Sequence, residues 1–165
     1  MSEMDYEECA CKLLAKMKQG LFLVTGVEKP NIMTIGWGSI GIYWAKPVFI
    51  ALVRPSRYSH ELIESCGEFT INIPYADAES QFNICGTVSG RDEDKFALCS
   101  YTPIPSRKVA VPIISECNLH FECRPVYYGQ IEPDTLNVEL EMKYYKGSDY
   151  HTLYVGEILD CYQRV

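Results

Sequence analysis

Short apolar runs rich in β-branched residues recur along the chain, and they constrain its fold more than any other feature. Each run has the length of a strand, so the runs indicate β-structure. The connections between them vary in length and lack the strand–helix–strand rhythm of a parallel sheet. The sequence therefore predicts a mainly β fold, a mostly antiparallel barrel or sandwich of six or seven strands with a few peripheral helices. The clearest predicted strands are residues 21–27, 31–40, 47–53, 69–73, 117–128 and 151–162.

Helical patterns are shorter and lie before or between these strands. Residues 5–19 carry an apolar face of Leu13, Leu14 and Met17, and Gly20 is suited to end that helix. Three further short helices are predicted: one that begins near residue 61 and stops at Gly67, one over residues 77–83, and one that begins within residues 92–96.

Two segments are harder to assign from their pattern. The three prolines of residues 101–112 make this segment a poor candidate for a central strand. Residues 136–142 alternate apolar and polar side chains, which indicates a strand. The proline, aspartate and glycine that flank them suit a short helix equally well, so the sequence leaves both structures open.

The composition favours one globular domain. The chain has 165 residues, of which 47% are hydrophobic, and it shows no repeat or linker, so we expect a single domain over residues 1–165 with an N-terminal helix within residues 1–20. The net charge is −7 and no basic stripe is present, so nucleic acid is not an expected partner. The richest apolar windows are interrupted and strand-length, so no membrane span is expected.

The eight cysteines are read as structural thiols. No CxxC pair occurs, so neither a zinc nor an iron–sulfur site is predicted, and no other metal site is expected. The sequence shows no signal peptide and enough core to fold without disulfides, so we expect reduced, half-buried thiols in a cytoplasmic protein. Cys117 and Cys123 are six residues apart and would face the same side of a regular strand, which indicates packing.

The segment that follows the predicted strand 47–53 is suited to bind phosphate. It reads Arg54-Pro-Ser-Arg-Tyr-Ser59 and leads into the predicted helix that stops at Gly67. A helix N-terminus preceded by guanidinium and hydroxyl groups binds phosphate through its free amides, its dipole and bidentate contacts. Ser56 and Ser59 are both candidates for the N-cap. The alternative is an ordinary capped helix with two surface arginines.

Residues 85–96 form a second segment of the same character. They contain two glycines, two small hydroxyl residues, Arg91 and Lys95, and their Ser-Gly-Arg-Asp centre predicts a turn before a helix. The alternative is an ordinary solvated loop. Two such segments in an acidic chain favour a phosphorylated small molecule held in a pocket.

A series of short motifs extends from about residue 20 to the C-terminus. Each motif is weak alone, but their shared order and spacing resemble the flavin reductase-like proteins of the FMN-binding split-barrel fold, and most of all the flavoredoxin branch. The motifs are Asn31-Ile-Met-Thr-Ile-Gly-Trp37, Trp44-Ala-Lys-Pro47, Arg54-Pro-Ser-Arg-Tyr-Ser59, Gly67-Glu-Phe-Thr-Ile-Asn-Ile73, Ser89-Gly-Arg-Asp92, Asp94-Lys-Phe96, Glu116-Cys117 and Tyr150-His-Thr-Leu-Tyr-Val-Gly-Glu-Ile158.

The resemblance implies a split β-barrel, a Greek-key-like antiparallel barrel, that binds FMN at the interface of a homodimer. It implies that one group of residues lies beside the flavin ring or ribityl chain and that two turns contact the phosphate. The ring group is Met33, Thr34, Trp37 and Ser39. The residues of the first turn are Arg54, Ser56, Arg57, Tyr58 and Ser59, and those of the second turn are Ser89, Arg91 and Lys95.

The resemblance also implies an oxidoreductase that transfers hydride from NAD(P)H to flavin and passes the electrons to an acceptor. His151 falls where similar flavin reductases place a histidine near the nicotinamide; the alternative is a structural histidine. The main functional alternative is a flavoredoxin-type electron carrier that a partner protein reduces, without significant NAD(P)H activity. A flavin-storage module, and a relative that binds haem or oxidises pyridoxamine phosphate, are further alternatives; haem is disfavoured because no histidine stands out as an axial ligand.

Overall fold

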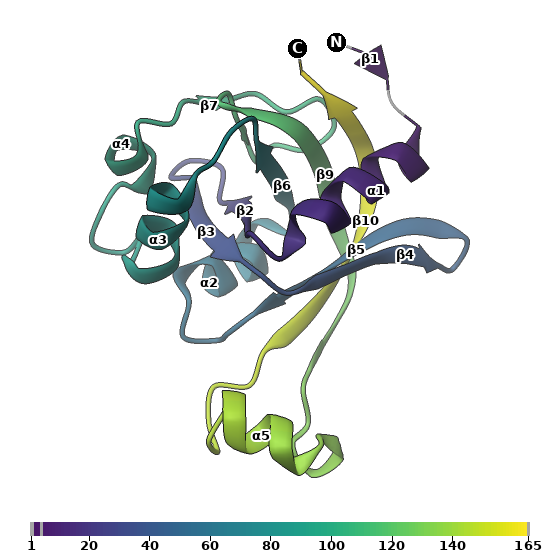
Figure 1. Ribbon diagram of the computed structural model, residues 1–165, viewed down its shortest axis with the longest axis vertical. Coiled ribbons are helices and arrows are strands. Elements are labelled where there is room, and N and C mark those ends of the chain that lie inside the picture. Colours follow the sequence, from purple (N-terminus) through teal and green to yellow (C-terminus); the bar gives the residue numbers. More distant parts are fainter. Residues whose placement is uncertain (1, 4, 165) are drawn as a thin grey trace.

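The computed structural model describes residues 2–3 and 5–164 and shows a curled antiparallel sheet surrounded by helices (Figure 1). The main sheet has the order β3-β2-β6-β9-β10-β5-β4, with β1 beside β10, and β7 pairs only with β8. The strands are β1 (Ser2–Glu3), β2 (Leu21–Thr25), β3 (Asn31–Ile35), β4 (Gly38–Tyr43), β5 (Lys46–Val53), β6 (Phe69–Pro74), β7 (Pro103–Ile104), β8 (Ile113–Ile114), β9 (Cys117–Gln130) and β10 (Thr152–Gln163). The helices are α1 (Tyr6–Met17), α2 (Tyr58–Cys66), α3 (Glu79–Thr87), α4 (Lys95–Cys99) and α5 (Val138–Tyr144), with a 3-10 turn at Pro133–Thr135. The predicted mainly β, antiparallel fold is confirmed.

The predicted strand 31–40 is two strands, and the difference creates the most important feature of the sheet. β3 and β4 follow each other in the chain but lie at opposite edges of the main sheet. Gly36 and Trp37 make the bend between them, which fits the tendency of a glycine inside a strand pattern to mark a sharp change of direction. The sheet therefore curls without closing, and its two edges meet along a seam at this bend.

The sheet is buried on both faces along β2. Leu21 and Leu23 belong to the core cluster that contains α1, whereas Phe22 and Val24 belong to a second cluster beneath α3 and α4. A strand covered on both faces reads as a continuous apolar run, which is the pattern that Leu21–Thr25 shows. In Figure 1, α3 and α4 lie on one side of the sheet, and α1 crosses the other side.

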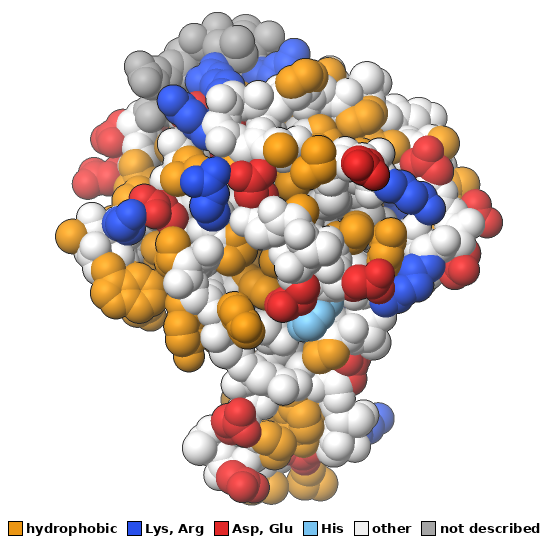
Figure 2. Space-filling model, turned by 180° about the vertical axis from the view of Figure 1, so that it is seen from behind, with side chains coloured by type: hydrophobic (Ala, Val, Ile, Leu, Met, Phe, Trp, Pro, Cys, Tyr) orange, Lys and Arg blue, Asp and Glu red, His pale blue; other side chains and the backbone are white. Residues whose placement is uncertain are grey.

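The segment that the sequence left open is a helix. α5 begins after Asn137, whose side-chain oxygen accepts hydrogen bonds from the backbone amides of Glu139 and Leu140. The helix stands away from the body, between the end of β9 and the start of β10 (Figure 1). From behind, it forms a separate lobe with exposed hydrophobic side chains (Figure 2), including Val138 and Met142.

Smaller differences from the predictions concern the ends of helices. α1 ends at Met17 with Lys18 as its C-cap, so Gly20 is not the cap, although its φ of 114° does require a glycine in the turn. α2 ends as predicted, because Gly67 adopts the left-handed conformation that terminates helices. Among the described residues, no helix is long and apolar enough to cross a membrane.

Cys117 and Cys123 do not share a face, contrary to the prediction. Cys117 belongs to the cluster beneath α3 and α4, and Cys123 belongs to the cluster that contains α1. The cause is a register shift: Pro74 pairs with Cys117 while Ile73 pairs with Leu119, so β9 carries an extra residue there. All eight cysteines, which lie within the described residues, are free thiols.

Candidate functional site

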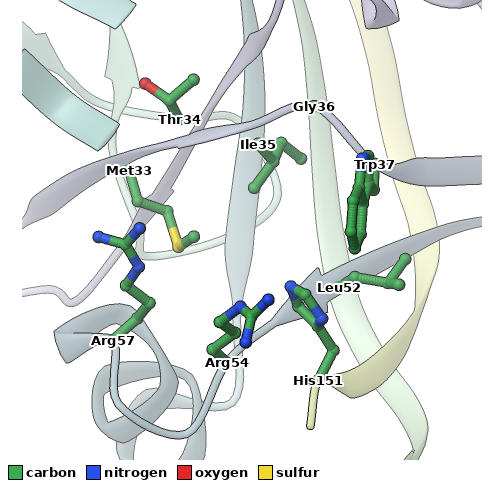
Figure 3. Close-up of a pocket in the computed structure, with 9 residues that line it drawn as sticks. All are labelled: Met33, Thr34, Ile35, Gly36, Trp37, Leu52, Arg54, Arg57 and His151. Carbon is green, nitrogen blue, oxygen red and sulfur yellow. The ribbon is translucent and has the colours of Figure 1, made fainter. Parts of the chain in front are cut away.

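A cavity of about 210 Å³ opens at the seam between β3 and β4. Its wall combines the end of β3, the bend at Gly36, the end of β5 and the residue before β10 (Figure 3). Three of the four predicted ring-binding residues, Met33, Thr34 and Trp37, line this cavity. His151 and two arginines of the first turn, Arg54 and Arg57, line it with them. The residues that line this cavity are Met33, Thr34, Ile35, Gly36, Trp37, Leu52, Arg54, Arg57 and His151.

A second cavity of about 80 Å³ adjoins the first and shares Met33 and Arg57 with it. It lies between the first predicted phosphate turn and the second one, which the fold brings face to face. Its lining is mostly polar and cationic: Asn31, Met33, Ser56, Arg57, Tyr58, Ser59, Thr87, Val88, Ser89, Gly90, Arg91 and Lys95. The prediction that these two distant segments serve one site stays a prediction, but their residues do line one cavity.

Arg57 occupies the junction between the two cavities. It is the N-cap residue of α2, and it makes no side-chain capping hydrogen bond to that helix. Its Nη1 donates a hydrogen bond to the carbonyl of Gly86 at 2.8 Å, which holds the guanidinium against the end of α3. Figure 3 shows this guanidinium beside Met33 at the cavity. A fixed cation at a helix N-terminus is suited to hold an anion there.

Ser56 and Ser59 have different roles from the predicted capping. The Ser56 amide and hydroxyl donate to the carboxylate of Asp149, at 3.1 and 2.7 Å. Ser59 lies within the first turn of α2, is buried, and accepts a hydrogen bond from Asn31 Nδ2 at 2.8 Å. Ser59 therefore fastens α2 to β3, while Ser56 fastens the first turn to the segment after α5.

Arg54 lines the larger cavity but is held by backbone carbonyls. Its two terminal nitrogens donate to Asp149 O at 3.0 Å and to Tyr144 O at 2.8 Å. Its guanidinium also lies 3.7 Å from the Asp149 carboxylate and 5.1 Å from the centre of the Tyr145 ring. Arg54 thus connects the end of β5 to the α5 segment, which the sequence did not predict.

Lys95 is the most deeply placed cation of the site. It is 5% exposed, and its Nζ donates to the carbonyls of Ile32 at 2.9 Å and Cys85 at 3.0 Å. Burial lowers the pKa of this ammonium, and the neighbouring Arg57 adds to that effect. Lys95 fastens the loop to β3 and places its charge beneath the smaller cavity.

Arg91, Ser89 and Tyr58 form the outer rim of that cavity. The Arg91 guanidinium lies 5.1 Å from the centre of the Tyr58 ring and donates to Ser56 O at 3.3 Å and to Glu61 Oε2 at 3.1 Å. The Ser89 hydroxyl accepts from the Arg91 amide at 3.2 Å. These exposed contacts join the second loop to the first turn.

Three of the predicted ring-binding residues lie at the cavities and the fourth does not. Met33 lines both cavities, and Thr34 donates a hydrogen bond to Phe82 O at 2.7 Å beside the larger one. Trp37 projects at the far wall, where its ring centre lies 5.2 Å from that of His151. Ser39 is exposed on β4 and lines neither cavity.

His151 is neutral in this site. Burial lowers its pKa to about 4, and the nearby Arg54 charge acts in the same direction. Its Nδ1 lies 2.9 Å from the Tyr145 hydroxyl, whose own pKa is raised by burial, so the phenol keeps its proton. His60, near the start of α2, is half-buried and shares a hydrogen bond of 3.1 Å with Thr152 Oγ1.

Sequence reasoning missed the residues that the α5 segment brings to the site. Tyr144 packs its ring edge-on to Trp37 at 4.9 Å between centres, while Tyr145 contacts His151 and Asp149 holds the first turn. Their segment gave no clear secondary-structure signal, and nothing in it predicted a contact with residues 54–56. Asn31 was also missed as a partner of Ser59, although it opens the first motif of the resemblance.

Comparison with known proteins gives a consistent family. The model of the flavin reductase like domain matches residues 14–164. An uncharacterized protein of Archaeoglobus fulgidus is 37% identical to this chain over 83% of it and 67% of the relative. The flavoredoxin of Desulfovibrio vulgaris is 28% identical, with a TM-score of 0.69 over 88% of this chain and 69% of that one.

A third comparison bears on the fold alone. A putative flavin reductase with a split barrel domain, from Shewanella frigidimarina, is 17% identical and has a TM-score of 0.69 over 96% of this chain and 74% of that one. The predicted split barrel is therefore confirmed, and the seam between β3 and β4 is its opening. The family model covers residues 14–164, which shows that this chain belongs to the family of the flavin reductase like domain.

Proposed function

We propose that the chain binds FMN across the two joined cavities and acts as an NAD(P)H-dependent flavin oxidoreductase. Flavin-related redox chemistry is the general function of the family to which the chain belongs. The observation that carries the finer proposal is the junction itself: a cationic cavity and a cavity with an open, partly apolar wall share Met33 and Arg57. A molecule with an anionic tail and a flat head matches this shape.

The smaller cavity fits the FMN phosphate. Arg57 and Arg91 supply guanidinium groups on two sides, Ser89 supplies a hydroxyl, and the first amides of α2 face the same place. Lys95 adds positive charge from beneath. In a chain of net charge −7, this local concentration of cations supports a small anionic ligand.

The larger cavity fits the isoalloxazine ring. Met33 and Leu52 give apolar contact, and the backbone from Thr34 to Trp37 provides a polar edge. A Cβ added at Gly36 would meet no atom within 4 Å, so the bend leaves open space beside the backbone. Backbone amides of such an edge are suited to hydrogen-bond the pyrimidine end of a flavin.

FMN held by these residues would supply the redox chemistry, namely uptake of a hydride from a nicotinamide and return of two electrons to an acceptor. The residues of the chain bind and orient. His151, held neutral by its burial and fixed at Nδ1 by Tyr145, lines the cavity and is suited to form a hydrogen bond with the nicotinamide amide. Trp37 and Tyr144 bound the space in which the nicotinamide would lie.

We also propose that the active form is a homodimer with FMN at the interface. Several large side chains are exposed together at the tip of the β4–β5 hairpin and along the outer part of β9, including Tyr43, Trp44, Tyr127 and Tyr128. Exposed apolar patches of this kind commonly mark protein interfaces. Sedimentation of the purified protein with and without FMN tests this part of the proposal, and a monomer under both conditions would contradict it.

The absorbance spectrum of the purified protein tests the proposed function directly. A yellow protein, or a colourless one that takes up added FMN in a titration, is expected; a protein that binds no FMN would overturn the proposal. The second step is anaerobic mixing with NADH and with NADPH in a stopped-flow instrument. Rapid loss of the flavin absorbance with either nicotinamide is the expected result for a reductase.

A flavoredoxin-type carrier is the second candidate, and one contact favours it. Tyr144 lies edge-on against Trp37 at 4.9 Å and narrows the space proposed for the nicotinamide. Flavoredoxin of Desulfovibrio vulgaris is also among the most similar solved structures. Bound flavin that neither nicotinamide bleaches, but that a partner protein reduces readily, would favour the carrier.

A further inference from the structure

Two buried thiols lie in contact at the base of the loop that lines the smaller cavity. Cys85 lies in the last turn of α3, and Cys99 is the last residue of α4. Their Sγ atoms are 3.5 Å apart. Cys85 has no exposed surface and Cys99 exposes 5% of its surface. The two cysteines therefore enclose residues 86–98, which include Ser89, Arg91 and Lys95.

We propose that Cys85 and Cys99 form a redox modification site, in which a peroxide converts the two thiols into a reversible disulfide that cross-links the ends of this loop. The sulfur atoms must approach from 3.5 Å to a bond length of about 2.05 Å. α4 is a single short helix of five residues, so a small displacement of its last residue suffices. The contact joins two elements that the chain already packs together in one core cluster.

The oxidation proceeds in two steps whose atoms and electrons balance. The Cys99 thiolate attacks one oxygen of hydrogen peroxide, which breaks the O–O bond, gives a sulfenic acid and releases hydroxide, which takes a proton to become water. The Cys85 thiolate then attacks the sulfenic sulfur, forms the S–S bond and expels a second hydroxide, again protonated to water. The two thiols lose two protons and two electrons in total, and the peroxide gains them. A dithiol reductant reverses the change.

Burial and the nearby Lys95 charge set the speed of these steps, and the difference in exposure between the two cysteines sets their order. Burial raises the pKa of both thiols, so thiolate is scarce and the reaction is slow compared with that of an exposed thiol. The Lys95 ammonium, which donates to Cys85 O at 3.0 Å, favours the thiolate form of each cysteine. Cys99 reacts first because it alone of the pair has exposed surface.

The cross-link would change the mobility of the proposed anion site. In the dithiol form, Lys95 holds the loop to β3 through Ile32 O and to α3 through Cys85 O. A disulfide adds a covalent closure around residues 86–98, which restricts local opening of this segment. The proposal does not depend on flavin binding, since its readouts are the two sulfur atoms and the backbone between them.

Mass spectrometry of the reduced protein treated with hydrogen peroxide tests the proposal. The expected product is lighter by two hydrogen atoms, has two fewer alkylatable thiols after denaturation, and returns to the starting mass with dithiothreitol. Without reduction, trypsin should release a linked pair of peptides, residues 58–91 and 96–107. Because residues 58–91 also contain Cys66, the Cys66→Ser variant must still give the linked pair.

Two variants and a backbone measurement complete the test. Cys85→Ser and Cys99→Ser must each abolish the linked pair, and amide hydrogen exchange across residues 86–98 must be slower in the oxidised than in the reduced parent. The proposal is overturned if Cys85 and Cys99 stay alkylatable while the exposed Cys11 is oxidised. It is also overturned if, in the oxidised parent, residues 58–91 are linked to a cysteine peptide other than residues 96–107.

Discussion

The two ends of the seam are held in different ways. At the end that carries the smaller cavity, the fastening contacts are buried: Asn31 to Ser59, and Lys95 to the carbonyls of Ile32 and Cys85. At the other end, the α5 segment is fastened mostly by partly exposed contacts from Arg54 and Ser56, and none of the residues of α5 itself is buried. One end is part of the core, and the other rests on the surface.

This difference indicates that the two ends have different roles in ligand binding. The buried end is preorganised, so an anion that enters it need not order the chain and loses less affinity to conformational entropy. Gly90 shows how closely this end is packed, because a Cβ there would collide with the Asn31 side chain. The α5 end can move at lower free-energy cost, so it is the part suited to admit different reaction partners of the flavin that we propose.

Removal of the Lys95 amino group should have the largest effect on the buried end. Lys95→Ala leaves two buried carbonyls without their donor, which should lower the free energy of unfolding by about 2–4 kcal/mol. Urea denaturation followed by circular dichroism measures this change. Lys143→Ala, on the exposed surface of α5, is the matched control and should change stability by less than about 0.5 kcal/mol. Equal effects of the two substitutions would contradict the comparison.

Substitutions of Arg57 and Arg54 should distinguish the residue that binds the phosphate from the residue that holds the α5 segment. Arg57→Ala should weaken FMN binding by about 10-fold or more, as expected for loss of a charge-assisted contact. Arg54→Ala should weaken it less, because the Arg54 donors are already occupied by Asp149 O and Tyr144 O. Fluorescence titration with FMN gives both affinities. If Arg54→Ala is the more damaging substitution, the phosphate lies nearer β5 than we propose.

The pH dependence of stability tests whether the α5 end stays closed in solution. Burial lowers the pKa of His120 and of His151 to about 4, below the unfolded value of 6.5. Between these values the unfolded chain binds more protons than the folded one, so stability falls as the pH falls from about 6.5 towards 4. As the pH falls from 7 to 5.5, each histidine should lower the free energy of unfolding by about 1 kcal/mol.

The variant His151→Asn isolates the contribution of the α5 end. It should lose the part of the pH dependence that belongs to His151 and keep the part that belongs to His120, which lies in the core beside Asn72. Denaturation curves at several pH values give this difference. An unchanged pH dependence would mean that His151 is solvated in solution and that the α5 end is open.

Asp149 should give the smallest effect of this series. Asp149→Asn keeps one acceptor for Ser56 but removes the charge that faces Arg54 at 3.7 Å, which should change stability by less than about 1 kcal/mol. The more sensitive measurement for this variant is amide hydrogen exchange, which should become faster over residues 138–149 and stay unchanged over residues 86–98. Faster exchange in both segments would show that the two ends of the seam are not independent.

Sequence periodicity predicted most of the strands because each buried run has its own local signal. Strands β5, β6 and β10 lie within a residue or so of the predicted ranges, and Gly67 ends α2 as expected. The break after Ile35 was missed because both halves of residues 31–40 look like strand, and only the tertiary structure places them at opposite edges. The register shift near Cys117 was missed for the same reason, since nothing in the local pattern marks an extra residue.

The candidate site was predictable where its residues carry charge or hydroxyl groups in turns, and not where they act across the fold. The two polar segments were identified, but sequence alone could not tell that Ser59 and Lys95 point into the interior while Arg57 points at the cavity. Asp149 acts through a contact with Ser56, which lies 93 residues away in the chain. Tyr145 contacts His151, and its burial depends on the position of α5, whose sequence pattern is ambiguous.

The seam between β3 and β4 gives a ligand a mechanical role as well as a chemical one. Because β3 and β5 share no backbone ladder, a molecule lodged between Met33 and Leu52 would hold β3 against β5. A ligand that binds the folded chain and not the unfolded chain raises the free energy of unfolding by mass action. If that molecule is FMN, as we propose, the cellular amount of the folded protein would follow the supply of the vitamin from which FMN is made.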